Sequence, residues 1–190
     1  LNDCIAESDW VFESVAEDLS IKLEVHSRIN QAMGHDTIVS SGTSSYRIEE
    51  LASAYSEENR RQLFGTHFFN PPDALTLLEL VRTTWSDIES GDTLQTFLTS
   101  VLRRSCIEVD DVNGFLANRI GALFLNEALL LAEQSEGRLG IERIDSVLGK
   151  FTGRKLSPVK TIDYIGLDVF AKMIENIHGD MDDALSPKVT

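Results

Sequence analysis

The sequence predicts an α/β sheet followed by an all-helical region. In residues 10–109, short strand-like runs alternate with amphipathic stretches of helical period, which is typical of a mostly parallel sheet. From Gly114 onward, only stretches of helical period follow. The chain of 190 residues is 42% hydrophobic and 25% charged, so it can bury a core of ordinary size.

The first region contains five predicted strands with helices between them. Asp18 is a suitable cap for the first helix, whose apolar residues from Ile21 to Met33 recur at helical spacing until Gly34 ends it. Strands are predicted at residues 10–15, 37–40, 63–69, 76–81 and 105–109, and the later helices of this region at residues 48–55 and 93–104.

The second region is predicted to be helical at residues 115–134, 141–150 and 161–178. Its most apolar window, residues 115–132, is interrupted by four polar residues and therefore predicts a buried helix, not a membrane span. The pattern changes between residues 110 and 114. We therefore expect one domain over residues 1–112 and a helical domain over residues 113–190.

Net charge and cysteine use exclude several classes of function. The formal net charge of −14 repels nucleic acid and anionic membrane surfaces, although backbone N–H groups can still bind a phosphorylated cofactor. Cys4 and Cys106 lie far apart without a CxxC pair or a flanking His, so we expect neither a disulfide nor a metal site. A reducing compartment follows: the cytoplasm is our first expectation, with mitochondria and peroxisomes left open.

Two absences concern the start of the chain. The first residue is Leu1 and no basic segment followed by an apolar run is present, so we expect no signal peptide and a fragment or processed chain. No GxGxxG motif occurs, so the phosphate-binding turn that opens a dinucleotide-binding fold is not among these residues. The five strands could therefore form a complete unrelated sheet or the later part of a larger one.

His67 and Glu79 are the strongest candidates for catalysis. His67 lies near the carboxyl end of a predicted strand, where α/β sheets bind ligands, and its ordinary pKa suits a general base. Glu79 lies in an apolar predicted strand and could orient that histidine if the two strands are neighbours. The alternatives are a structural histidine beside Phe68 and Phe69, and a glutamate that faces solvent.

Other polar residues have ordinary structural explanations. The hydroxyl-rich turn at residues 40–45, which contains Ser44, could bind a ligand, but turns of this kind more often cap a helix. Asn118 could reach a substrate oxygen or cap the helix that it opens. Glu17 and Lys22 have the pattern of charges on a helix surface.

Taken together, these segments resemble the 3-hydroxyacyl-CoA dehydrogenase family. The residues that carry the resemblance are Ser-Gly-Thr-Ser-Ser at 41–45, Gly-Thr-His-Phe-Phe-Asn-Pro at 65–71, Leu-Leu-Glu-Leu-Val at 77–81 and Gly-Phe-Leu-Ala-Asn-Arg-Ile at 114–120. They occur in the family order and at near-family spacing. Residues 9–18 and 163–168 also resemble family segments, so the resemblance spans nearly the whole chain.

The resemblance implies the later portion of a Rossmann-like NAD-binding domain followed by an all-helical C-terminal domain. It implies NAD-dependent oxidation of (S)-3-hydroxyacyl-CoA to 3-oxoacyl-CoA in fatty-acid β-oxidation. The implied catalytic residues are His67 as general base, Glu79 as its support, and Ser44 and Asn118 as ligands of the substrate oxygen. The implied cofactor-binding positions are Glu17, Lys22, Gly42, Ser44 and Asn70.

Departures from the family pattern limit what this chain is expected to do. The family usually has Asn at the position of Gly42, so one contact is lost or supplied by water. Residues 153–158 replace the common family turn and resemble the dehydrogenase section of bifunctional chains. Without the first strands and the glycine-rich turn, we expect a fragment at both ends that is inactive alone. We further expect the full protein to bind acyl-CoA and to form a homodimer through the helical domain.

Two competing interpretations remain. The turn at residues 70–72 and the segment 112–115 also resemble the lambda-crystallin and gulonate dehydrogenase branch, whose substrate is a sugar acid. Alternatively, the chain is a non-catalytic dimerisation module, because the apolar stripe of residues 115–134 suits a subunit interface.

Overall fold

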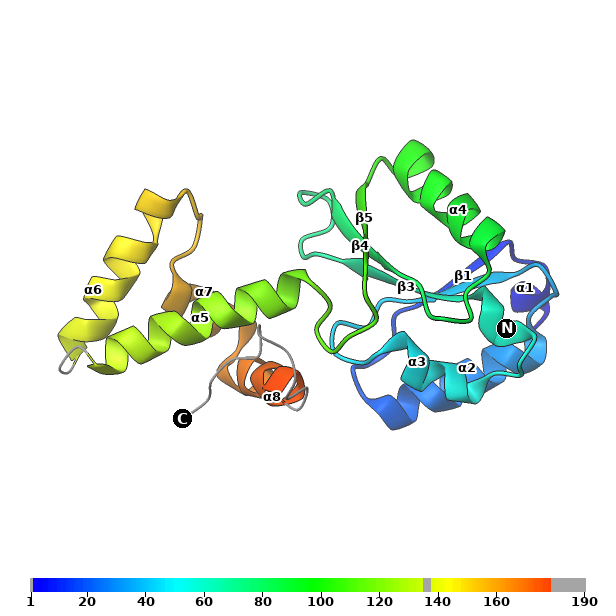
Figure 1. Cartoon of the computed structure of the whole chain (residues 1–190), viewed down its shortest axis with the longest axis horizontal. Coiled ribbons are helices and arrows are strands. Elements are labelled where there is room, and N and C mark those ends of the chain that lie inside the picture. The colour runs from blue at the N-terminus through cyan, green and yellow to red at the C-terminus, as the bar shows by residue number, and fades with distance from the viewer. Residues whose placement is uncertain (1, 135–137, 179–190) are drawn as a thin grey trace. The chain divides into compact units, whose positions relative to one another are not determined.

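The computed structural model describes residues 2–134 and 138–178 and divides into two compact units, residues 1–116 and residues 117–190 (Figure 1). The first unit is a sheet covered by helices and the second contains helices. This arrangement confirms the predicted α/β sheet followed by a helical region.

The sheet has five strands in sequence order: β1 (Trp10–Glu13), β2 (Ile38–Ser41), β3 (Leu63–Phe68), β4 (Leu77–Val81) and β5 (Ser105–Val109). The pairs β1–β2, β2–β3 and β4–β5 are parallel, whereas β3 and β4 are antiparallel. The connection 69–76 contains no helix, and a parallel return needs a crossover of a dozen or more residues. β4 therefore returns antiparallel to β3, and this reversal brings the two strands' side chains into direct opposition.

Helices cover both faces of the sheet, as Figure 1 shows. On one face, α2 (Leu19–Ala32) and α3 (Ile48–Leu51) pack apolar residues such as Ile29 and Leu51 against Val39 and Val81. On the other face, α4 (Ile88–Thr96) and the π-helical turn that continues it pack against β3 and β4. The smaller helical elements are α1 (Asn2–Ala6) and the 3₁₀ turns Ala52–Ala54 and Asn59–Gln62.

Two predicted helices and one predicted strand are wrong in their bounds. The helix predicted from residue 93 begins at Ile88, because the Asp87 side chain caps it by accepting a hydrogen bond from the Ser90 N–H. The first predicted strand is shorter than expected and ends at Glu13. The single helix predicted over 161–178 is broken at Gly166, whose φ of 102° is not helical.

The second unit contains α5 (Ala117–Gln134), α6 (Arg138–Leu148), a 3₁₀ turn (Lys150–Thr152), α7 (Pro158–Ile165) and α8 (Leu167–His178). Its apolar core joins α5, α7 and α8 through buried side chains: Ala122, Leu125, Ile162, Phe170, Ile174 and Ile177. In the part of the chain that the structure describes, no helix combines the length and the apolar character needed to cross a membrane.

Gly65 lies where β3 meets the helix face, and its replacement tests the packing of the first unit. A Cβ at this position would lie 2.8 Å from Ile48 Cδ1 and 2.9 Å from Val81 Cβ. We expect Gly65→Ala to lower the free energy of unfolding by about 1–3 kcal/mol, because overpacking a tight core is destabilising. Chemical denaturation measures this difference.

The control is Gly121→Ala, at a position in α5 where a Cβ meets nothing within 4 Å. It should raise the free energy of unfolding by up to about 1 kcal/mol, the difference in helix propensity. A Gly65→Ala protein as stable as wild type would contradict the packing described.

Candidate active site

The antiparallel pairing of β3 and β4 places His67 directly opposite Glu79. His67 Nδ1 lies 2.7 Å from Glu79 Oε2, and both side chains are buried. The other oxygen, Glu79 Oε1, accepts a hydrogen bond of 3.1 Å from the backbone N–H of Leu116. A carboxylate can only accept, so Nδ1 carries the proton and Nε2 is left as the basic nitrogen.

The turn after β2 brings a hydroxyl to that basic nitrogen. Ser44 Oγ lies 3.0 Å from His67 Nε2, so the hydroxyl can donate to the ring. β2 pairs with β3, and residues that follow β2 therefore lie beside the carboxyl end of β3. The structure thus brings together His67, Glu79 and Ser44 from three adjacent strands or their ends.

Aromatic rings enclose the histidine. The ring of Phe69 has its centroid 4.6 Å from that of His67, and the ring of Phe115 has its centroid 5.7 Å away. Phe115 is 1% exposed. Excluding water in this way strengthens the electrostatic interaction between His67 and Glu79, because the local dielectric constant is low.

A second polar cluster, which we call the Glu13 cluster, lies buried beneath the turn that carries Ser44. It contains five residues: Glu13, Lys22, His26, Ser41 and Tyr55. Each has an exposed fraction below 10%. The Glu13 carboxylate accepts from Lys22 Nζ at 2.9 Å, from Ser41 Oγ at 2.5 Å and from His26 Nε2 at 3.2 Å.

Protonation in the Glu13 cluster follows from these contacts. Burial raises the pKa of Glu13, but hydrogen bonds from His26, Ser41, Lys22 and the Val15 backbone outweigh it and lower the pKa to about 2. Because the ionised carboxylate only accepts, His26 donates through Nε2, and its Nδ1 accepts a hydrogen bond from the Tyr55 hydroxyl, 2.6 Å away. Burial and the charge of Glu13 together raise the pKa of Tyr55.

Sequence reasoning missed Glu13, His26 and Tyr55. A charged residue at the end of an apolar strand was the one available signal for Glu13, because such a residue is rarely buried without partners. His26 and Tyr55 are separated by 29 positions, and no spacing rule connects them.

The proposed cofactor positions lie in different surroundings. Glu17 accepts from Thr43 Oγ1 and from the backbone N–H of Ser44, and its second carboxylate oxygen lies 3.2 Å from Lys22 Nζ. Burial raises the pKa of Glu17. The hydrogen bond from the Thr43 hydroxyl, the charge of Lys22 and the hydrogen bond from the Ser44 amide together lower that pKa by more, so the net shift is downward. Asn70 is exposed just after β3.

Gly42 and Asn118 complete the predicted set. A Cβ on Gly42 would lie 2.8 Å from Phe12 Cζ, so the Phe12 ring fills the space of a side chain at position 42. An asparagine could not be added there without moving that ring. Asn118 lies in the first turn of α5 in the second unit.

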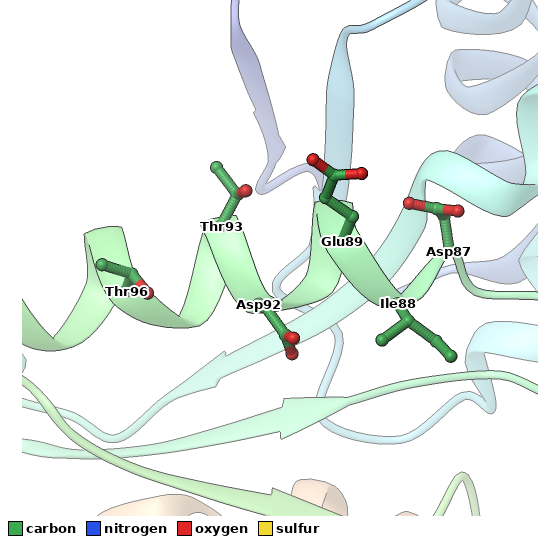
Figure 2. Close-up of a pocket in the computed structure, with 6 residues that line it drawn as sticks. All are labelled: Asp87, Ile88, Glu89, Asp92, Thr93 and Thr96. Carbon is green, nitrogen blue, oxygen red and sulfur yellow. The ribbon is translucent and has the colours of Figure 1, made fainter.

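A groove along α4 is chemically unsuited to an anionic ligand. Figure 2 shows its lining residues, Asp87, Ile88, Glu89, Asp92, Thr93 and Thr96. Its three carboxylates disfavour phosphate groups, and it shares no residue with the His67 site. Among residues 2–134 and 138–178, no group of three or more His, Cys, Asp or Glu side chains could hold a metal ion.

The sheet is of the Rossmann-like class, and the buried His67–Glu79 pair lies near the carboxyl end of β3. The family described as "3-hydroxyacyl-CoA dehydrogenase, NAD binding domain" matches residues 1–112, and "3-hydroxyacyl-CoA dehydrogenase, C-terminal domain" matches residues 114–189. The chain therefore belongs to the 3-hydroxyacyl-CoA dehydrogenase family.

Two curated relatives show the extent of the similarity. The chain is 32% identical to a probable 3-hydroxyacyl-CoA dehydrogenase of Bacillus subtilis, covering 94% of this chain and 22% of that protein. It is also 32% identical to the mitochondrial hydroxyacyl-coenzyme A dehydrogenase of Sus scrofa, covering 94% of this chain and 55% of that protein. The chain thus spans about half or less of the length of these relatives.

Solved structures share the fold. The (S)-3-hydroxybutyryl-CoA dehydrogenase PaaH1 of Ralstonia eutropha is 28% identical with a TM-score of 0.86, covering 98% of this chain and 64% of that one. FadB2 of M. tuberculosis is 26% identical with a TM-score of 0.88 over the same shares of the two chains.

The low pKa of Glu13 predicts how stability depends on pH. Its folded pKa of about 2 lies below the ordinary 4.5, so its contribution is present above pH 4.5 and is lost as pH falls toward 2. At about 1.4 kcal/mol for each pH unit between the two values, the contribution reaches roughly 3 kcal/mol. The difference in unfolding free energy between wild type and Glu13→Gln should therefore narrow by about 2 kcal/mol between pH 7 and pH 3.

Glu24→Gln is the control, because Glu24 lies exposed on α2, the helix that carries Lys22 and His26. Its difference from wild type should not narrow in this way. A Glu13→Gln difference that stays constant with pH would contradict the assignment of Glu13 as a buried ionised carboxylate.

Proposed function

We propose that the chain carries the catalytic residues of an NAD-dependent 3-hydroxyacyl-CoA dehydrogenase, which oxidises (S)-3-hydroxyacyl-CoA to 3-oxoacyl-CoA in fatty-acid β-oxidation. The observation that carries this proposal is the buried His67, fixed by Glu79 on one nitrogen and contacted by Ser44 on the other. Such an arrangement suits removal of a proton from a secondary alcohol. The names of the curated relatives support the substrate class.

The residues present fit one half of the NAD molecule. Glu17, Ser44 and Asn70 follow β1, β2 and β3, and their carboxylate, hydroxyl and amide groups suit the polar nicotinamide and ribose end. The family match to an NAD-binding domain supports this cofactor. No glycine-rich phosphate turn occurs in the 190 residues, so the pyrophosphate needs groups outside them.

The protein's part in the reaction is proton transfer and positioning. NAD supplies the acceptor for the hydride that leaves C3 of the substrate. His67 Nε2 takes the proton of the 3-hydroxyl as the C3–O bond becomes a carbonyl. Glu79 holds the ring tautomer and stabilises the imidazolium that forms. Phe69 and Phe115 exclude water from the ring.

Ser44 is the proposed ligand of the substrate oxygen. Its hydroxyl lies within hydrogen-bond distance of Nε2, so an oxygen bound beside both groups is oriented toward the base. Asn118 keeps its family role as a second proposed ligand of that oxygen. Lys22 and Gly42 remain proposed cofactor-side positions, with the Phe12 ring occupying the place of the usual asparagine side chain.

We further propose that turnover belongs to the full-length gene product. The 190 residues alone are expected to be inactive, because they lack the phosphate-binding turn. The domain boundary near residue 112, the acyl-CoA partner and a reducing location such as the cytoplasm form part of the same proposal. Cys4 and Cys106 are both free cysteines, which suits such a location.

Replacement of His67 tests the proposed reaction. In the full-length gene product, we expect NADH oxidation with acetoacetyl-CoA, and a 10²–10⁴-fold lower kcat/KM for His67→Gln, because general-base catalysis contributes about that factor. Glu24→Gln should keep the wild-type rate. Absence of turnover in the wild type, or a His67→Gln enzyme at the wild-type rate, would contradict the proposal. Turnover of gulonate instead would favour the sugar-acid branch.

The helical unit is proposed to form a homodimer. Its exposed apolar side chains include Tyr164, Leu167 and Val169, with exposed fractions of 80%, 71% and 54%. Exposed apolar surface of this kind favours association. Sedimentation equilibrium of the full-length gene product should give twice the chain mass, and Leu167→Glu should shift the protein toward the monomer. A wild type that is monomeric at all concentrations would exclude the dimer.

A further inference from the structure

The turn that carries Ser44 is held by one carboxylate from a different part of the chain. Glu17 Oε1 accepts three hydrogen bonds from this turn: from Thr43 Oγ1 at 2.6 Å, from Ser44 N at 2.8 Å and from Ser45 N at 2.9 Å. Glu17 lies between β1 and α2, and the turn follows β2. A single oxygen therefore ties together the ends of two neighbouring strands.

The charge of Glu17 is itself fixed from the core. Its second oxygen lies 3.2 Å from Lys22 Nζ, and the Lys22 side chain is 1% exposed. That ammonium group also donates to Glu13 Oε1 at 2.9 Å. Glu13 in turn accepts hydrogen bonds from Ser41 and His26, so Glu13 anchors Lys22 to the rest of the Glu13 cluster.

The described contacts form a continuous path from the core to the base. It runs from Glu13 to Lys22 and from Lys22 to Glu17. It continues from Glu17 to the backbone N–H of Ser44, and from the Ser44 hydroxyl to His67 Nε2. Every connection is a hydrogen bond or an ion pair of 3.2 Å or less. The inner part of this path, Glu13 and Lys22, is buried, whereas the Glu17 side chain is 38% exposed. A buried polar pair with satisfied partners is rigid, so it can fix the Glu17 carboxylate that holds the turn.

We propose that Glu17 is a positioning residue that holds the Ser44 hydroxyl against His67, and that the Glu13 cluster holds Glu17 through Lys22. The catalytic consequence rests on the proposed function. Placement errors of about 1 Å in a reacting group can cost 10²-fold in rate. This role is additional to the proposed cofactor contact of Glu17, because here Glu17 acts on the reaction through Ser44.

Two substitutions distinguish the role of the Glu17 acceptor oxygen from the role of the Glu17 charge. Glu17→Gln keeps a carbonyl oxygen that can accept the three hydrogen bonds of the turn, but it loses the ion pair with Lys22. Glu17→Ala loses both. A positioning role therefore predicts a large effect for Glu17→Ala and substantial rescue by Glu17→Gln.

The first experiment measures the turn directly in the 190-residue chain. Amide hydrogen exchange at Ser44 and Ser45, followed by NMR, should be about tenfold or more faster in Glu17→Ala, because a charge-assisted hydrogen bond is lost. The ¹⁵N shift of His67 Nε2 should change in the same variant, as its Ser44 contact weakens. The exchange rates and the His67 shift should stay near the wild-type values in Glu17→Gln and in the control variant Glu24→Ala. Unchanged exchange and an unchanged His67 shift in Glu17→Ala would overturn the proposal.

The second experiment is a double-mutant cycle in the full-length gene product. If Glu17 acts through Ser44, Glu17→Ala should lower kcat/KM about tenfold or more in the wild-type background and less than about twofold in a Ser44→Ala background. Both backgrounds are measured at saturating NADH, so that a loss of cofactor affinity does not enter the comparison. Effects of the two substitutions that are independent and multiply at saturating NADH would overturn the proposal. An inactive wild type would overturn the proposed function alone, and the exchange rates would then decide the role of Glu17.

Discussion

The register between β3 and β4 is the constraint on which the site depends. It sets His67 opposite Glu79, so that a 2.7 Å hydrogen bond forms between two buried side chains. A slip of one residue would turn Glu79 to the opposite face of the sheet and leave the histidine without its carboxylate. The short connection between the strands and the apolar residues on both faces of β4 fix this register. The backbone N–H of Leu116 then holds the second carboxylate oxygen.

The buried charge of Glu13 requires partners that neutralise it and satisfy its hydrogen bonds. The Glu13 cluster meets that requirement, because its carboxylate is paired with Lys22 and receives hydrogen bonds from Ser41 and His26. An unpaired charge at the same depth would be strongly destabilising. The cluster lies below the turn after β2, and Glu17 extends it to the surface. Stability of the first unit and the geometry of the candidate site therefore share the same polar contacts.

The sequence predicted the parts of the fold that depend on local pattern. Strand periodicity located β1 to β5, and the placement of His67 and Glu79 in successive strands made their contact foreseeable. Other features depend on contacts between distant residues. The His26–Tyr55 hydrogen bond and the Phe12 ring over Gly42 leave no periodic signal. The helix break at Gly166 was missed because the apolar spacing continues across it, whereas α1 is too short for periodicity to detect.

The central claim is that His67 Nε2 and Ser44 Oγ together receive the reacting oxygen. A crystal structure of the full-length gene product with NAD⁺ and acetoacetyl-CoA tests it most directly. The account predicts the 3-oxo oxygen within about 3 Å of both atoms, with the His67–Glu79 hydrogen bond retained. A complex in which that oxygen binds away from His67, or in which Glu79 has left the ring, would contradict it.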